Sequence, residues 1–380
     1  MATQQQDTSG AGWRMGSVMG IPVYLGRSWI VIAVVIVVTF GPQVEDRLPY
    51  LGGQAYVVAM LYALLLLLSV LAHEASHAVV GKWRGYEVRQ IVADLWGGHT
   101  AYDTDDASPA SSALVAVAGP LTNGVLAGVA WLLLPHVTRD VPQLLIVAFF
   151  VANAFVAIFN LLPGLPLDGG FLVDALVWRI TGSRPTGLIV AGWCGRMLTA
   201  LVVLGALAWT YGSGGSPDYV TIIWAVFIAG FLWFGASSSI ERGKAQRLLA
   251  RVTVDAVVRP VVFAPGVTLV SDLPSNIAIA VCDHDGKPWG LIPSDQRELV
   301  PVGARDHTTA NSLAQTQATG WACQVSSPQA DVTELVRTVQ LSGEQMPNVL
   351  VFDGAGRPLG VVAVAELGDA LRRAEHQAAR

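Results

Sequence analysis

The sequence predicts an α-helical polytopic membrane protein that carries a soluble α/β tail. Charged residues make up only 13% of its 380 residues, against about 25% in typical soluble chains, and the mean hydropathy is +0.51. Charges are sparse up to about Ser239 and dense afterwards, so the membrane part comes first. The sequence pI of about 5.8 and the lack of a basic patch argue against nucleic acid as a partner. Three cysteines without paired spacing argue against a disulfide framework.

Six hydrophobic stretches are long enough to cross a membrane, because a spanning helix needs about 20 mostly apolar residues. They cover residues 26–42, 54–80, 110–134, 142–165, 187–211 and 219–237. The first stretch follows a polar segment without a convincing cleavage site, so we interpret it as a retained span and not a signal peptide. The fourth closes at Pro163 and Pro166, which cannot continue a helix.

The connection at residues 81–108 is more than a loop. Residues 87–96 roughly alternate polar and apolar side chains and then meet Gly97 and Gly98. This pattern predicts a strand followed by a turn, with an ordinary surface hairpin as the alternative interpretation.

Orientation follows from lysine and arginine, which are retained on the cytoplasmic side of a membrane. With the N-terminus inside, the outside loops carry only Arg47 and Arg139. The inside segments carry Arg14, Arg27, Lys82, Arg84, Arg89, Arg179, Arg184, Arg242, Lys244 and Arg247. This asymmetry predicts that both termini are cytoplasmic.

The tail contains an internal repeat. Residues 278–292 read as a strand, an Asp-x-x-Gly turn and a second strand, and residues 349–362 repeat this pattern about seventy residues later. Repetition of one α/β unit is the natural interpretation. We therefore expect a membrane domain at 1–240, a linker at 241–251, and two tail domains at 252–310 and 311–380.

The residues that carry chemistry begin with His73-Glu74-x-x-His77, at the end of the second stretch. Two histidines four residues apart share one face of a helix and can hold Zn²⁺, while the intervening glutamate can serve as a general base. The alternative is that these residues meet by chance, but ionisable groups within a span are expensive and usually functional. A catalytic zinc usually has a third protein ligand.

Asp168 is the best candidate for that third ligand. It follows the prolines that close the fourth stretch, and the topology brings it to the same membrane depth as His77. Broken backbone at that depth is tolerated where it lines a cavity. The alternative is a helix-capping aspartate.

These motifs together resemble those of the site-2 protease family of intramembrane zinc metalloproteases. The resemblance rests on the histidine motif, on Asn160-x-x-Pro-x-x-Pro-x-Asp168-Gly169, and on Gly119-Pro-x-x-Asn123 between them. It implies that His73, His77 and Asp168 hold one zinc ion per chain.

The resemblance also implies catalytic and substrate-binding roles. Glu74 would activate the water, and Asn160 would hydrogen-bond the substrate carbonyl or oxyanion, with a helix-pairing amide as its alternative role. Substrate-binding residues would be Leu95, Trp96, Gly97 and Gly98, which form an edge for a substrate strand, together with Asn123.

The tail resembles a tandem pair of CBS domains. In that family, paired domains often bind adenine nucleotides through a Thr or Ser and an Asp that follow the last glycine of the repeat. This chain has Pro293 and Gln296 there in the first copy, and Ala363 and Glu366 in the second. These departures favour the alternative, a packing module or a homodimer through the tail.

The predicted function is that of an intramembrane zinc endopeptidase which cleaves a transmembrane segment of a partner protein, such as an anti-sigma factor. The alternative is a zinc-binding membrane transporter or sensor whose tail reads a ligand. The near-minimal membrane core and lack of organellar targeting predict a prokaryotic inner membrane. Arg196 lies deep in the fifth span, and we hypothesise that Asp174 or a nearby carbonyl compensates its charge; the alternative is a snorkelling, silent arginine.

Overall fold

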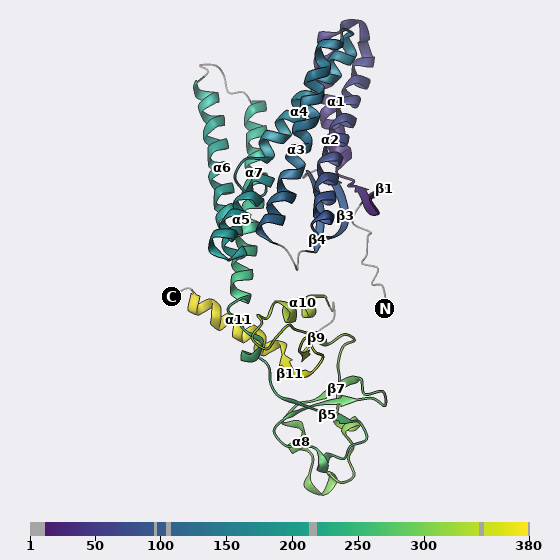
Figure 1. The fold of residues 1–380 in the computed structure, drawn as a ribbon, viewed down its shortest axis with the longest axis vertical. Coiled ribbons are helices and arrows are strands. Elements are labelled where there is room, and N and C mark those ends of the chain that lie inside the picture. Colours follow the sequence, from purple (N-terminus) through teal and green to yellow (C-terminus); the bar gives the residue numbers. More distant parts are fainter. Residues whose placement is uncertain (1–11, 95–96, 104–107, 213–218, 342–345, 379–380) are drawn as a thin grey trace. The chain divides into compact units, whose positions relative to one another are not determined.

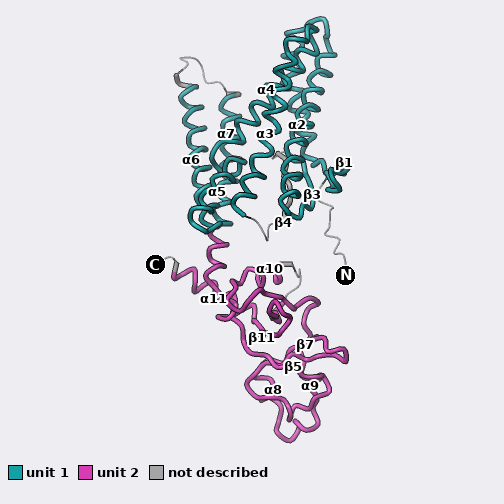
Figure 2. Tube along the Cα trace, viewed as in Figure 1, with its two compact units in different colours: residues 1–243 teal, residues 244–380 magenta. Residues whose placement is uncertain are grey.

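The computed structural model describes residues 12–94, 97–103, 108–212, 219–341 and 346–378 (Figure 1). The chain divides into two compact units, Met1–Gly243 and Lys244–Arg380 (Figure 2). The first unit is mostly long apolar helices and the second is an α/β tail. The predicted fold class is therefore confirmed.

Six of the described helices are long and apolar enough to cross a membrane, as predicted. They are α1 (Trp29–Arg47), α2 (Ala55–Trp83), α3 (Pro109–Leu133), α4 (Asp140–Asn160), α6 (Arg184–Gly212) and α7 (Tyr219–Leu249). The fourth ends at Asn160 rather than at residue 165, and the last continues to Leu249 through most of the expected linker 241–251. Within the unit, α2 packs against α1 and α3.

The sequence did not predict helix α5 (Asp168–Thr181), which at 14 residues is too short to span a membrane. It follows the proline-broken segment after α4 and packs against α3 and α6. It ends at Gly182, whose φ of +71° is the left-handed conformation that commonly closes a helix. This helix gives Asp168 a fixed place in a first helical turn.

A four-stranded sheet accompanies the helices, in the order β1-β2-β3-β4. Its strands are β1 (Trp13–Val18), β2 (Ile21–Leu25), β3 (Glu87–Asp94) and β4 (Gly97–Asp103). The hairpin of β1 and β2 was not predicted. The expected turn at Gly97 and Gly98 is also wrong, because these residues begin β4 and pair with Asp94 and Ala93.

The tail holds two sheets. The first comprises β5 (Val261–Pro265), β6 (Ala278–Cys282), β7 (Pro288–Ile292) and β8 (Gln315–Thr316); the second comprises β9 (Ala322–Gln324), β10 (Asn348–Phe352) and β11 (Pro358–Ala363). The tail helices are α8 (Gln296–Leu299), α9 (Ala310–Leu313), α10 (Thr333–Leu341) and α11 (Val364–Ala378).

The internal repeat is visible at its turns. Asp283 Oδ1 accepts hydrogen bonds from the backbone N–H groups of residues 285 and 287, and Asp353 Oδ1 accepts them from residues 355 and 357. Gly286 and Gly356 then take matching φ values of +75° and +76°. An Asp side chain that caps its own turn and a glycine at positive φ explain why both copies carry Asp-x-x-Gly.

The two halves of the tail exchange residues across the expected division at 310. Val252, Val254 and Val257 join the core beneath the second sheet, where Leu350 is fully buried. In the other direction, β8 pairs with β7 of the first sheet. The division at 310 therefore does not separate two self-contained units, because the core of the second half includes residues 252–257 and the first sheet includes β8.

Candidate metal centre

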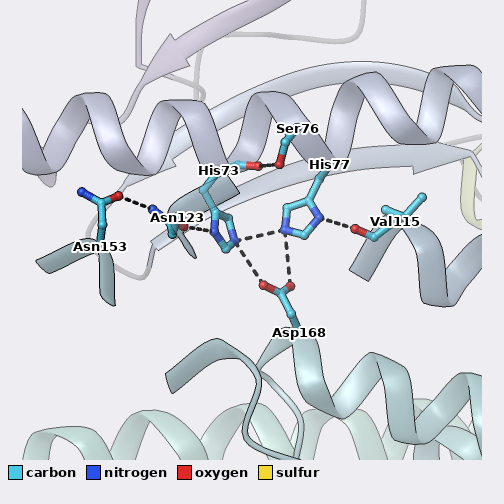
Figure 3. A network of polar contacts seen from close by, with 7 residues as sticks. All are labelled: His73, Ser76, His77, Val115, Asn123, Asn153 and Asp168. Carbon is cyan, nitrogen blue, oxygen red and sulfur yellow. Dashed lines mark hydrogen bonds and ion pairs between the residues drawn. The ribbon is translucent and has the colours of Figure 1, made fainter. Parts of the chain in front are cut away.

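Helix α2 presents one face to the sheet and another to the candidate site. Leu71, Ala75 and Ala78 pack with the buried Ile21 and Ile91 of the sheet. The two histidines lie two residues beyond Leu71 and Ala75, about 200° around the helix. His73 and His77 therefore point away from the sheet and are both buried (Figure 3).

Asp168 is held opposite the histidines by close backbone packing. A Cβ atom at Gly169 would lie 2.4 Å from the carbonyl oxygen of Leu161, and one at Gly170 would lie 2.2 Å from the backbone nitrogen of Leu165. Only glycine fits at such approaches. The glycine pair thus lets the chain turn back against itself immediately after Asp168.

The three side chains converge. His73 Nε2 lies 3.1 Å from Asp168 Oδ2, His77 Nε2 lies 3.4 Å from Asp168 Oδ1, and the two Nε2 atoms are 3.0 Å apart (Figure 3). Ligands about 2.0–2.1 Å from a tetrahedral zinc are separated by about 3.3 Å. The spacing of these three donors therefore fits a zinc ion.

Two further features fit a metal. Asp168 Oδ2 is buried, and His73 Nε2, 3.1 Å away, is not placed to form a well-aligned hydrogen bond with it. Gly119 of α3 faces the same point, since a Cβ there would lie 2.4 Å from Nε2 of both histidines. The chain therefore keeps space where the donors meet.

The remaining ring nitrogens of the two histidines are also engaged. His77 Nδ1 donates to the carbonyl oxygen of Val115 at 2.7 Å, and His73 Nδ1 lies 2.5 Å from Asn123 Oδ1 (Figure 3). Such partners orient a ligand imidazole and fix its tautomer. Asn123 is fully buried behind His73, so the structure corrects its expected role: it supports a candidate ligand and does not face a substrate.

Glu74 is buried and lies beside both histidines. Its carboxylate belongs to a group of three potential ligand atoms, with those of His73 and His77, that all lie within 4.8 Å of one another. The Asp168 oxygens lie 3.1 and 3.4 Å from the two Nε2 atoms, which is the separation expected of ligands that share one zinc ion. Asp168 therefore fits the place of a third donor, and Glu74 is a further carboxylate next to it.

The structure does not bring every predicted residue to the site. Asn160 is half-buried at the last position of α4, and no hydrogen bond joins it to the other described site residues. Gly97 and Gly98 lie on the edge strand β4, whereas Leu95 and Trp96 fall outside the described residues. The roles of Asn160 and of this edge stay predictions.

Arg196 has partners other than the expected Asp174. Its guanidinium lies 4.9 Å and 4.8 Å from the ring centroids of Trp193 and Trp233, and Nη2 donates to Ser237 Oγ at 3.2 Å. Asp174 is fully buried, and neither of its carboxylate oxygens has a hydrogen-bond partner among the described residues. The hypothesis that Asp174 compensates Arg196 is therefore wrong: aromatic faces stabilise this cation.

Sequence reasoning missed one functional candidate. Asn153 of α4 accepts a hydrogen bond from Asn123 Nδ2 at 2.7 Å and is fully buried (Figure 3). Its signal was available in the sequence, because polar side chains within a membrane span are usually functional.

The fold and the site define a polytopic membrane protein in which two buried histidines meet an aspartate beside a buried glutamate. The sequence profile of peptidase family M50 matches residues 61–142 and 135–205. A relative from Mycobacterium tuberculosis, which carries the name zinc metalloprotease Rip3, is 31% identical over 95% of this chain and 94% of its own length. A second, from Synechocystis and named zinc metalloprotease sll0528, is 28% identical over 93% and 94%. The chain therefore belongs to peptidase family M50, the site-2 protease family of membrane-embedded zinc metalloproteases.

Two solved structures are also similar. A site-2 protease from Methanocaldococcus jannaschii aligns with a TM-score of 0.44 at 21% identity, covering 60% of this chain and 94% of that one. The CBS domain of a bacterial CNNM/CorC family Mg²⁺ transporter aligns with a TM-score of 0.23 at 13% identity, covering 36% and 87%.

Proposed function

We propose that this metalloprotease uses His73, His77 and Asp168 to hold its zinc and cleaves a transmembrane segment of a partner protein. The observation that supports this most strongly is the convergence of three donors next to Glu74: two come from the spanning helix α2 and one from the short helix α5. A membrane-embedded active site has its nearest substrates in other membrane helices. The partner would be a regulatory membrane protein, such as an anti-sigma factor.

The residues of the chain divide the chemistry between them. Bound zinc would supply a Lewis acid that lowers the pKa of water. Glu74 would accept a proton from the attacking water and later donate it to the leaving amine. Asn160 would donate a hydrogen bond to the developing oxyanion, a contribution of about 2.7–4 kcal/mol for one well-placed donor.

The substrate segment would be read as a strand. A helical substrate shields its scissile carbonyl, so the segment must unwind before hydrolysis. Strand β4 is one edge of the four-stranded sheet and could pair with the unwound segment. Leu95, Trp96, Gly97 and Gly98 would contact it there.

Cross-linking tests this path. In a Glu74→Gln chain without native cysteines, a cysteine at Gly98 should form a disulfide with a cysteine in a captured substrate segment. A cysteine at Ser17, on the opposite edge strand β1, is the matched control. Equal cross-linking from both edges would reject β4 as the strand that pairs with the substrate segment.

The lysine and arginine distribution supports cytoplasmic termini, with the site near the cytoplasmic face, and the near-minimal membrane core supports a prokaryotic inner membrane. Thiol labelling of single cysteines from the two sides of sealed membranes would test this orientation. Labelling of a C-terminal cysteine from the outside would overturn it.

The tail would regulate substrate access or form a homodimer. Glu366 stands where nucleotide-binding relatives are expected to carry an Asp, and its carboxylate is already paired with Arg259 Nη2 at 2.5 Å. This pairing weighs against an adenine nucleotide at the second copy. Mass measurement of the detergent-solubilised chain with and without ATP would test both ideas.

The decisive experiment compares Glu74→Gln with the wild type. The variant should retain stoichiometric zinc and lose cleavage, which comparative proteomics of membrane-protein fragments would detect. Glu87→Gln, an exposed residue of β3, is the control and should cleave normally. Undiminished proteolysis by Glu74→Gln would reject Glu74 as the base, and zinc binding without any cleaved helix in the wild type would reject the proposed substrate class.

A further inference from the structure

A chain of buried side chains leads away from the candidate metal centre. Asn123 Oδ1 lies 2.5 Å from His73 Nδ1, Asn123 Nδ2 lies 2.7 Å from Asn153 Oδ1, and Asn153 Nδ2 lies 2.9 Å from Ser69 Oγ. Three of these side chains are 0–1% exposed and His73 is 5% exposed. The chain joins α2, α3 and α4, and part of it is visible in Figure 3.

The far end of this chain fixes its direction. Asn153 Nδ2 also lies 2.8 Å from the carbonyl oxygen of Phe149, and Ser69 Oγ lies 2.9 Å from the carbonyl oxygen of Leu65. A backbone carbonyl can only accept. The hydroxyl of Ser69 therefore donates to Leu65, and the amide nitrogen of Asn153 must face Phe149 and Ser69.

The same logic continues to the histidine. With its nitrogen committed, Asn153 presents Oδ1 to Asn123, so Asn123 must present Nδ2 to Asn153. Asn123 then has only Oδ1 for His73, and an amide oxygen can only accept. The proton of the neutral imidazole is thereby fixed on Nδ1, and the lone pair on Nε2 is left for a metal.

We propose that Asn153 is a positioning residue that sets the tautomer of His73 through Asn123. The hydrogen bonds of Asn153 go to Asn123, Ser69 and Phe149 and to none of the candidate ligands. Asn153 would act by preventing Asn123 from adopting the reversed orientation of its side-chain amide. In that orientation the amide nitrogen of Asn123 would face His73, and the imidazole proton of His73 would move to Nε2. Zinc would then have to displace that proton before it could bind.

The two histidines differ in this respect. The Nδ1 of His77 donates directly to the carbonyl oxygen of Val115, which is part of the backbone and cannot reverse. An amide can rotate by 180° and exchange its oxygen for its nitrogen. His73 therefore needs a second amide behind the first, whereas His77 does not.

A rival explanation is that Asn153 only holds three helices together. Hydrogen bonds between membrane helices contribute modestly to stability, so the loss of Asn153 would lower stability without a special effect on the metal. The two explanations predict different effects of Asn153 on zinc affinity in a variant where either orientation of side chain 123 can accept from His73. Asn123→Asp creates that situation, because a carboxylate accepts from His73 Nδ1 in either orientation. The same change places a carboxylate oxygen opposite Asn153 Oδ1, which is also an acceptor, so Asn153 no longer supports residue 123 in this background.

The test is a double-mutant cycle on zinc affinity, measured by chelator competition in the purified full-length chain. Asn153→Leu should weaken zinc binding about 10–100-fold, as losses of outer partners of metal ligands typically do. In the Asn123→Asp background the same Asn153→Leu change should not weaken zinc binding by more than about threefold. Thr199→Val, which removes another buried hydroxyl from a spanning helix, should leave the affinity unchanged.

Equal losses in both backgrounds, or no loss in either, would overturn the proposal. If Asn153→Leu does not fold, Asn153→Ser in the same cycle tests the same non-additivity with a smaller loss. The inference rests on the proposed ligand His73, so His73→Ala is included. Zinc bound with wild-type affinity by His73→Ala would mean that the ligand assignment had failed, and not the role of Asn153.

Discussion

Replacement of Gly119 by alanine should weaken zinc binding strongly while leaving the fold in place. The added Cβ would lie 2.4 Å from Nε2 of both His73 and His77, whereas ordinary contact begins at about 3.4 Å. Each imidazole must therefore retreat by about 1 Å, several times the tolerance of about 0.2 Å for a metal–ligand distance. Because the loss of an outer partner alone costs about 10–100-fold in metal affinity, displacing two ligands should cost at least about 100-fold.

The assay is chelator competition on the purified chain, with circular dichroism to follow helix content. Gly124→Ala in the same helix is the matched control, since nothing lies within 4 Å of its added Cβ, and its affinity should equal that of the wild type. Zinc binding by Gly119→Ala within about threefold of the wild type would refute the reasoning that the histidine nitrogens meet at this glycine.

Three further predictions concern packing and charge. Gly195→Ala would place a Cβ 2.0 Å from the carbonyl oxygen of Leu165 and should lower the free energy of unfolding by about 1–3 kcal/mol. It should also weaken zinc binding, because the segment before Asp168 moves. Gly205→Ala in the same helix is the control, since its added Cβ has open space, and an equal effect there would contradict the argument. Arg196→Met should lower the free energy of thermal unfolding by about 1–2 kcal/mol. In a double-mutant cycle, its interaction energy with Asp174→Asn should be below about 0.5 kcal/mol. A larger interaction energy would mean that Asp174 and Arg196 do interact. The backbone N–H of Arg357, together with further hydrogen bonds, lowers the pKa of Asp353. The ionised Asp353 should therefore stabilise the fold above about pH 4, and this stabilisation should be lost as the pH falls through the lowered pKa. Asp353→Asn should flatten that part of the acid-unfolding curve, and an unchanged curve would contradict the prediction.

The sequence was sufficient for the spans and for the two histidines, because hydrophobic length and four-residue spacing are local signals. It was also sufficient for Asp168, because the order of the spans brings the end of the fourth to the membrane depth of His77. It was insufficient for α5, whose 14 residues fall below the length of a span and begin just after two prolines. Strands β1 and β2 were missed because the sheet that they complete depends on pairing with β3, sixty residues or more away in the chain.

The errors at Asn123 and Arg196 have a different cause. Sequence indicates that a polar side chain in a span needs a partner, but not which one. Asn123 could face a substrate or a ligand, and its burial between His73 and Asn153 decides between them. The partner of Arg196 had a local sign, since Trp193 precedes it by three residues and shares its helix face.

The proposed ligands come from two helices that are far apart in the sequence, and this has a consequence for biosynthesis. Two donors lie on α2, and the third begins α5, after α3 and α4 have followed in the chain. A nascent chain that has inserted only its first spans holds two histidines and a glutamate but no third donor. It would remain inert towards neighbouring helices in the membrane, and proteolytic competence would arise only once the fourth span was in place and the chain had turned back at Asp168.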